Sequence, residues 1–169
     1  MTISKKLFLA SAFFICATVA NAQIKLGHIN STQLLSSMPE TKLADSTLQK
    51  FGESLQAQLK TMSAEYDAKV ADYQAKSEAM AEPVRTTKEK EIRDLGQRIQ
   101  DFQESAQQSV QKKKEDVYSP IIKKAEEAIK AVGKDKGYTY IFDASIGALL
   151  YSSDSDDIMA LVKAKLCLK

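Results

Sequence analysis

The stretch of sequence that decides the fold is LQKFGESLQAQLKTMSAEYDAKVADY, residues 48–73. Its apolar side chains follow one another at spacings of three or four residues: Leu48, Phe51, Leu55, Leu59, Met62, Tyr66, Val70 and Tyr73. This spacing places them in one narrow stripe along a single helix. Because Phe51, Met62 and Tyr73 recur every 11 residues, the helix should run nearly straight or slightly right-handed rather than as a heptad supercoil.

The stripe belongs to a predicted helix from about Glu40 to Ala81, which would be about 60 Å long at 1.5 Å per residue. A second striped helix follows, with apolar residues at Ile92, Leu95, Ile99, Phe102 and Ala106. Pro83 marks the tip between the two helices, because proline disfavours helix at the residue before it and permits a new start. The sequence therefore predicts a long antiparallel helical hairpin that protrudes as an arm.

The arm is predicted to have a thin apolar seam that is solvated on most sides. Methionine and aromatic side chains at helical spacing first of all join the two helices, and on a thinly packed rod they also suit loose contacts with varied apolar clients. The residues assigned to this seam and to client contact are Phe51, Met62, Tyr66, Tyr73, Met80 and Phe102.

The two ends of the chain differ from the arm. Residues 24–30 alternate as a short strand, Asn30 or Ser31 can cap the helical turn that follows, and Pro39 can start the first arm helix. Pro120 is expected to kink or break the rod, leaving a further helix over 121–134 that ends before Gly137.

The last part of the sequence predicts a β-hairpin and a short helix. The aromatic and β-branched segment 138–143 and the segment 148–151 flank a turn at 145–147, and the aspartates of 154–157 can cap a final helix. We expect an α+β fold, in which a small β body is made of the N-terminal strand and this C-terminal β-hairpin.

Such a small body would be marginal as a monomer and would expose sheet edges, so we expect it to assemble from several copies. Edge-to-edge pairing of sheets from different subunits would cover the apolar faces. The residues assigned to the body and to oligomer contact are Ile24, Leu26, Tyr140, Phe142, Leu149 and Tyr151.

Residues 1–22 carry the three parts of a secretory signal peptide: basic Lys5 and Lys6, an apolar run over 7–19, and small residues before the cleavage site. The apolar run is shorter than the roughly 20 residues that cross a membrane, although a retained N-terminal anchor is the alternative. We expect a single mature domain over 23–169, with a body from 23–39 and 120–169 and an arm from 40–119. Cleavage would leave Cys167 as the one thiol.

Composition and motifs argue against an enzyme and against a nucleic-acid-binding protein. Without Lys5 and Lys6 the chain has 22 basic and 22 acidic residues, whereas nucleic-acid-binding domains are basic. His28 is the single histidine, and Asp154, Asp156 and Asp157 lack the glycine and glutamate of a calcium loop. No phosphate-binding loop or paired-cysteine zinc pattern occurs, so we expect no catalytic residues, metal or cofactor.

The sharpest basic run is Lys112–Lys114, followed by Lys123 and Lys124. A solvated helix face is its ordinary explanation. The alternative is attraction of anionic lipid headgroups or of an acidic client.

The mature sequence resembles the Skp/OmpH-like family of periplasmic outer-membrane-protein chaperones. The resemblance rests on Ile24–Asn30 after a signal peptide, on the long charged hairpin, and on YIFDAS (140–145), YSS (151–153) and DDI (156–158). It implies a trimer with a β body and three helical arms around a cavity that receives unfolded outer-membrane proteins without ATP. One departure is charge: the best-known relatives are strongly basic, whereas the mature chain is formally neutral. This difference weakens the case for electrostatic capture of acidic clients and for any lipopolysaccharide site.

These observations lead to the hypothesis of a periplasmic holdase, which keeps the apolar strands of an unfolded client from pairing with other chains. The alternative is an envelope structural or adaptor protein whose coiled-coil arms bind one folded partner. An adaptor would be expected to have a well-filled heptad seam, and the first arm helix lacks that regularity.

Overall fold

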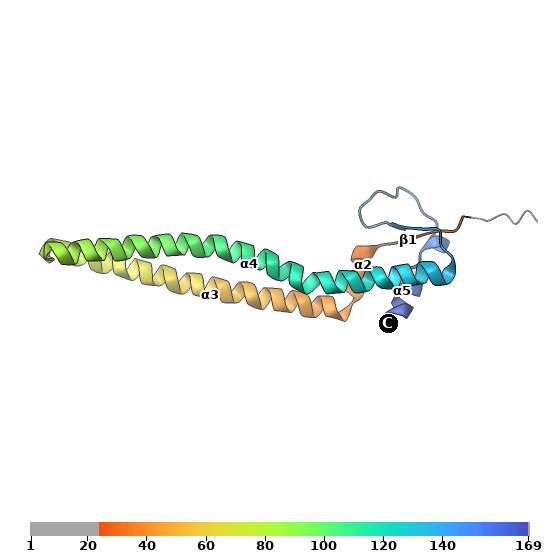
Figure 1. The fold of residues 1–169 in the computed structure, drawn as a ribbon, viewed down its shortest axis with the longest axis horizontal. Helices are drawn as coiled ribbons and strands as arrows, with labels where there is room; N and C mark the ends of the chain where they lie inside the picture. Colours follow the sequence, from red (N-terminus) through yellow and green to blue (C-terminus); the bar gives the residue numbers. More distant parts are fainter. Residues whose placement is uncertain (1–23, 169) are drawn as a thin grey trace, which may run out of the picture.

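The computed structural model describes residues 24–168, so the predicted signal peptide lies outside the described residues. Figure 1 shows a long arm of two antiparallel helices, α3 and α4, with a small body at one end. In chain order the elements are β1 (Leu26–Ile29), α2 (Ser31–Ser37), α3 (Pro39–Lys76), η2 (Ser77–Ala79), α4 (Glu82–Lys136), β2 (Tyr140–Asp143), η3 (Asp154–Asp156) and α5 (Met159–Lys165). The α+β fold with a protruding helical hairpin is confirmed.

The two arm helices begin and turn where the sequence predicted. The side chain of Asn30 accepts a hydrogen bond from the Gln33 N–H at 2.9 Å, which caps α2, and Pro39 occupies the start of α3. Proline is tolerated there because the N–H that it lacks would have no helical partner. At the tip, the short η2 helix and an extended Met80 reverse the chain before α4 starts at Glu82.

Helix α4 continues through Pro120, so of the predicted kink or break only the break, with the separate helix over 121–134, is wrong. Proline removes one helical hydrogen bond, but the residues after it pack onto the body, and tertiary packing of an apolar face supplies most of a helix's stability. In Figure 1 the helix changes direction near the body without being interrupted. It ends as predicted, before Gly137, whose φ of 70° is the left-handed conformation that favours glycine.

The body contains a two-stranded parallel sheet. Leu26 is opposite Tyr140 and Ile29 is opposite Asp143, while a single bridge joins His28 to Asp157 on the other side of β1. The whole helical arm is therefore the crossover between two parallel strands.

The predicted C-terminal β-hairpin is wrong, because residues 148–151 form no strand. Of the predicted segment 138–143, Tyr140–Asp143 do form a strand, but this strand pairs with β1, and the Asp157 bridge takes the other side of β1. Both sides of β1 are therefore occupied, and within the described chain 148–151 does not pair with the free edge of β2. Leu150 is accordingly 98% exposed, in a loop that turns at Gly147.

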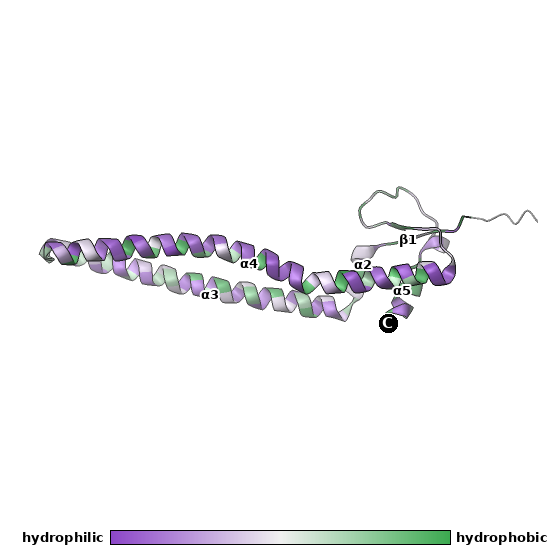
Figure 2. Cartoon of the chain, viewed as in Figure 1, coloured by the Kyte–Doolittle hydropathy of each residue, from purple (hydrophilic) through white to green (hydrophobic). Residues whose placement is uncertain are grey.

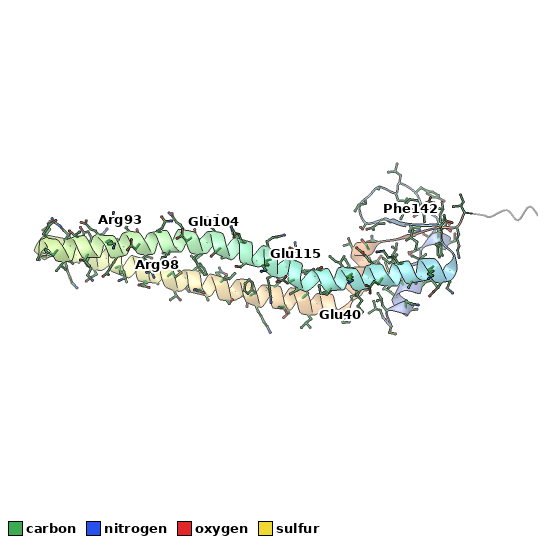
Figure 3. All side chains as sticks on the ribbon, in the orientation of Figure 1. Glu40, Arg93, Arg98, Glu104, Glu115 and Phe142 are labelled. Carbon is green, nitrogen blue, oxygen red and sulfur yellow. The ribbon has the colours of Figure 1, made fainter. Side chains whose placement is uncertain are left out.

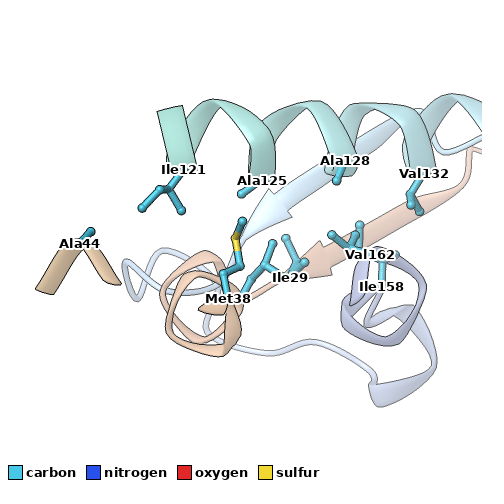
Figure 4. Packing of buried hydrophobic residues seen from close by; sticks show 10 residues of the cluster. Ile29, Met38, Ala44, Ile121, Ala125, Ala128, Val132, Ile158 and Val162 are labelled. Carbon is cyan, nitrogen blue, oxygen red and sulfur yellow. The ribbon is translucent and has the colours of Figure 1, made fainter. Parts of the chain in front are cut away.

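The core of the body lies beneath the C-terminal third of α4. Its members are Ile29, Leu34, Met38, Ala44, Ile121, Ala125, Ala128, Val132, Ile158 and Val162, most of which Figure 4 shows packing between α4 and the other body elements. The predicted final helix starts at Met159, whose N–H donates to Asp157 at 2.7 Å. Ile158, just before this helix, and Val162 within it are buried, whereas Leu161 is 36% exposed.

Asp143 ties the end of β2 to the start of α2. Its carboxylate accepts hydrogen bonds from the Ser31 N–H at 3.2 Å, from the Ser31 hydroxyl at 2.5 Å and from the Ser145 N–H at 2.8 Å. Partial burial alone would raise the pKa of Asp143, but these hydrogen bonds outweigh it and lower the pKa to about 2.

We expect Asp143→Asn to lower the free energy of unfolding at pH 6 by about 1–2 kcal/mol, because the amide nitrogen cannot accept the Ser31 hydroxyl. The folded pKa lies below the ordinary value of about 3.9, so the contribution of Asp143 is present above about pH 4 and is lost as the pH falls toward 2. Urea unfolding followed by circular dichroism at pH 6 and pH 3 measures both effects. Asp154→Asn, at an exposed aspartate of the body, is the control; a difference between Asp143→Asn and wild type that stays constant with pH would contradict this account.

Candidate functional site

The structure places the six predicted seam residues of the arm in half-buried positions along α3, the tip and α4. They are Phe51, Met62, Tyr66, Tyr73, Met80 and Phe102. Between residues 45 and 119, Leu95 is the one fully buried side chain among those described, at 1% exposure. The seam is therefore thin, and the apolar side chains that hold the hairpin together also remain accessible from its flanks. Figure 2 shows the same mixture, with apolar residues interspersed among polar ones along both helices.

Polar contacts join the two helices near the tip. Lys69 forms an ion pair with Glu91 at 3.0 Å, and Lys88 forms a longer one with Asp72 at 3.6 Å. The Tyr73 hydroxyl donates to Glu89. The hydrogen bond from Lys69 lowers the pKa of Glu91. These groups are largely exposed, so each contact stabilises the arm only slightly.

A second pair of polar contacts joins the helices at the root of the arm. Lys124 forms an ion pair with Glu40, and the Tyr118 hydroxyl donates to Asp45. The hydrogen bond to Asp45 raises the pKa of Tyr118. Cross-helix polar contacts are thus found at both ends of the hairpin.

The middle of the arm is joined by apolar contacts. Among the described residues, no hydrogen bond or ion pair links α3 to α4 between the Asp45–Tyr118 contact and the Lys69–Glu91 contact. An open groove of about 520 Å³ lies there, which we call the mid-arm groove; it is lined by Gly52, Leu55, Gln56, Leu59, Phe102, Gln103, Ala106, Gln107 and Val110.

The charged side chains lie on the surfaces of the arm. Figure 3 shows side chains projecting along its whole length, with Arg93, Glu104 and Glu115 labelled on α4. In the basic run, Lys112 and Lys114 are exposed and acidic Glu115 and Asp116 follow at once. Basic and acidic side chains therefore lie together on this turn of α4.

An apolar surface also covers one face of the sheet. The rings of Tyr140 and Phe142 stack with centroids 6.3 Å apart, and Leu26 is opposite Tyr140 in the register. These three side chains are 60%, 44% and 45% exposed, respectively. We call Leu26, Tyr140 and Phe142 the sheet patch.

The other residues assigned to the body differ in exposure. Ile24, just before β1, is 65% exposed, and Tyr151 in the loop is 88% exposed, whereas Leu149 is half-buried. Ile146 and Leu150 of the same loop are also exposed, at 76% and 98%.

His28 and Asp157, which were considered as candidate catalytic or metal-binding residues, make structural contacts. The Nε2 atom of His28 lies 3.1 Å from the Ser153 carbonyl oxygen, which ties β1 to the loop before η3. Asp157 caps α5. Over residues 24–168 there is no group of three or more potential metal ligands, and none of the helices is long and apolar enough to cross a membrane.

The sequence matches the family model for outer membrane protein (OmpH-like) over residues 25–166. The chain belongs to the Skp/OmpH-like family. It is also 25% identical over 165 residues to the chaperone protein Skp of Photorhabdus luminescens, an alignment that covers 94% of this chain and 96% of the relative.

A solved structure from Caulobacter crescentus CB15, described as an OmpH-like outer membrane chaperone, superimposes with a TM-score of 0.75. The match covers 86% of this chain and 85% of that one at 17% identity, and it shows that the fold is shared. Together, membership of the family and the similarity to Skp support a chaperone role rather than an enzymatic one.

The apolar spacing did not reveal the mid-arm groove or the contacts at the two ends of the hairpin. Gly52, near the start of the apolar stripe, was the available signal for the groove, because glycine is unfavourable inside a helix. The cross-helix contacts depend on which residues of α3 and α4 lie opposite each other, and the stripes alone do not set that register.

We expect the residues of the seam to contribute unequally to the free energy of unfolding. Leu95→Ala should lower the free energy of unfolding by about 2–4 kcal/mol, because it removes the one fully buried side chain of the seam. Leu55→Ala, on the half-buried wall of the groove, should cost less than about 1 kcal/mol. Thermal and urea unfolding at one protein concentration measure both, and equal losses for the two variants would contradict a seam anchored at Leu95.

Proposed function

We propose that this chain is an ATP-independent periplasmic holdase that binds unfolded outer-membrane proteins in a cavity between helical arms and prevents their aggregation. The observation that carries the proposal is the thin apolar seam of a 38-residue and a 55-residue helix, in which Leu95 alone is fully buried beyond the root. A hairpin so lightly packed offers apolar contacts along its whole length. Its similarity to a chaperone supports the same role.

The mechanism is preferential binding of the unfolded client. Many weak contacts with methionine and aromatic side chains of the arms exchange rapidly and tolerate varied sequences. Because binding stabilises the unfolded form by mass action, it keeps apolar strands from pairing with other chains and needs no nucleotide hydrolysis.

The cavity of this proposal requires several copies, and we propose a homotrimer. The sheet patch leaves three large apolar side chains in water, and β2 is an edge strand of a two-stranded sheet. An exposed edge is a template for pairing with another chain, and a second copy would cover both features. Ile24, Leu149 and Tyr151 would extend this contact.

We also propose that the chain is exported and that its mature part consists of a body and an arm. The signal peptide over 1–22 would deliver a mature domain, 23–169, to the periplasm, where the body over 23–39 and 120–169 would hold the arms of 40–119 in a common direction. Exposed Lys112 and Lys114 are the residues through which an arm would touch an anionic lipid surface, a weak contact because acidic residues follow them.

We expect Phe142→Asp to convert the trimer to a monomer, because it places a carboxylate in the apolar contact between copies. Multi-angle light scattering of the mature protein measures the mass. Val84→Asp is the matched control, since Val84 is 48% exposed at the start of α4, far along the chain from the sheet patch, and should leave the mass unchanged. A trimeric Phe142→Asp variant would rule out the sheet patch as the subunit contact.

We expect the mature protein at stoichiometric excess to suppress the light scattering of a denatured outer-membrane β-barrel protein that is diluted into buffer. Phe142→Asp should suppress it several-fold less, because the arms would no longer enclose a common cavity. Unchanged aggregation in the presence of wild type would refute the holdase function itself.

A further inference from the structure

Gly52 has no structural reason to be glycine. It lies inside α3 with helical backbone, and a Cβ built on it would meet no atom within 4 Å. Glycine is therefore required there neither by a left-handed conformation nor by a close neighbour, although it is less favourable than alanine in a helix interior. What glycine does at this position is leave the mid-arm groove open.

The lining of the groove specifies the character of an occupant. All nine lining residues are uncharged, in a chain in which 27% of residues are charged. A buried charge without a partner would be costly in such a site, so the occupant should be neutral and mainly apolar. Gln56, Gln103 and Gln107 add amide donors and acceptors, which match the free N–H and C=O groups of an extended peptide.

The dimensions of the groove specify the length of an occupant. Its volume of about 520 Å³ is in the usual range for binding pockets. On α3 the lining runs from Gly52 to Leu59, which corresponds to about 10 Å of helix. An extended chain advances about 3.3 Å per residue, so about three residues fit, and the first and third side chains face the same way.

We propose that the mid-arm groove binds extended client segments that carry apolar side chains two residues apart. This inference rests on the proposed holdase function and names the segment that the arm recognises. Membrane-spanning β-strands alternate apolar and polar residues, and their unfolded forms therefore carry this pattern repeatedly. A helical segment would instead place its apolar side chains three or four residues apart.

The test uses the mature protein and two fluorescein-labelled decapeptides of identical composition. One alternates Val and Thr, and the other has the sequence VTTVVTTVVT, in which no two Val are two residues apart. Wild type should bind the alternating peptide at least fivefold more tightly, measured by fluorescence anisotropy. Gly52→Leu fills the groove and should weaken that binding at least fivefold. Ala106→Leu, which fills the groove from α4, should have the same effect.

A glycine variant outside the groove separates blockage of the groove from a change in helix stability. Gly96→Ala favours helix, and residue 96 does not line the groove; the added methyl lies 3.4 Å from the Tyr66 ring. It should raise the unfolding temperature and bind the alternating peptide within twofold of wild type. Circular dichroism and light scattering show that each variant keeps its fold and its mass.

Three outcomes would overturn the proposal. Gly52→Leu and Ala106→Leu could bind the alternating peptide as tightly as wild type does. Wild type could bind both peptides with equal affinity, or bind neither. If dodecanoate binds the groove and the alternating peptide does not displace it, the occupant is an acyl chain and the proposal is also wrong. Aggregation of the β-barrel client, followed in parallel, distinguishes failure of the groove assignment from failure of the holdase function. If wild type and Gly52→Leu suppress it equally, the holdase function stands and the groove assignment fails.

Discussion

The parallel pairing of β1 with β2 is the constraint on which the rest of the structure depends. A parallel partner must enter the sheet from the same end as β1, and the chain between Ile29 and Tyr140 makes that return through the whole helical arm. This explains why α4 has 55 residues and α3 has 38. The difference corresponds to about 25 Å of helix, which carries the chain back past the start of α3 and along the body.

This extra length of α4 divides the molecule into two kinds of packing. Ile121, Ala125, Ala128 and Val132 follow one another at helical spacing and cover the body, where they are almost completely buried. Further out, the same helix meets α3 alone, and a pair of helices has no third layer to cover its seam. The root of α4 is thus fixed in a core, while the arm retains apolar surface that the hairpin itself cannot bury.

The sequence was sufficient for the features that depend on local pattern. The stripe from Leu48 to Tyr73, the cap at Asn30 and the stop at Gly137 each follow from spacing or from one residue's backbone preference. Strand propensity also identified Tyr140–Asp143 correctly.

Features that depend on partners could not be predicted in this way. Propensity does not say which strand lies alongside, so segment 148–151 was assigned as the hairpin partner of 138–143, whereas the strand that pairs with β2 is β1. Pro120 was expected to kink or break the rod, and tertiary contacts continue the helix through it. The mid-arm groove lies where Gly52 has no side chain. Apolar periodicity marks only the side chains that are present, so it could not reveal the groove.

Under the proposed function, the arm would use one apolar surface for two purposes. Side chains such as Leu55, Leu59 and Phe102 lie between α3 and α4 and also line the groove, so their contacts would contribute both to the stability of the hairpin and to binding. A ligand that enters the groove between helices binds the closed hairpin and not the separated one, and it must stabilise the closed form by mass action. The polar contacts at the tip and at the root confine this exchange to the middle of the arm, where no cross-helix ion pair among the described residues has to break for a segment to enter or leave.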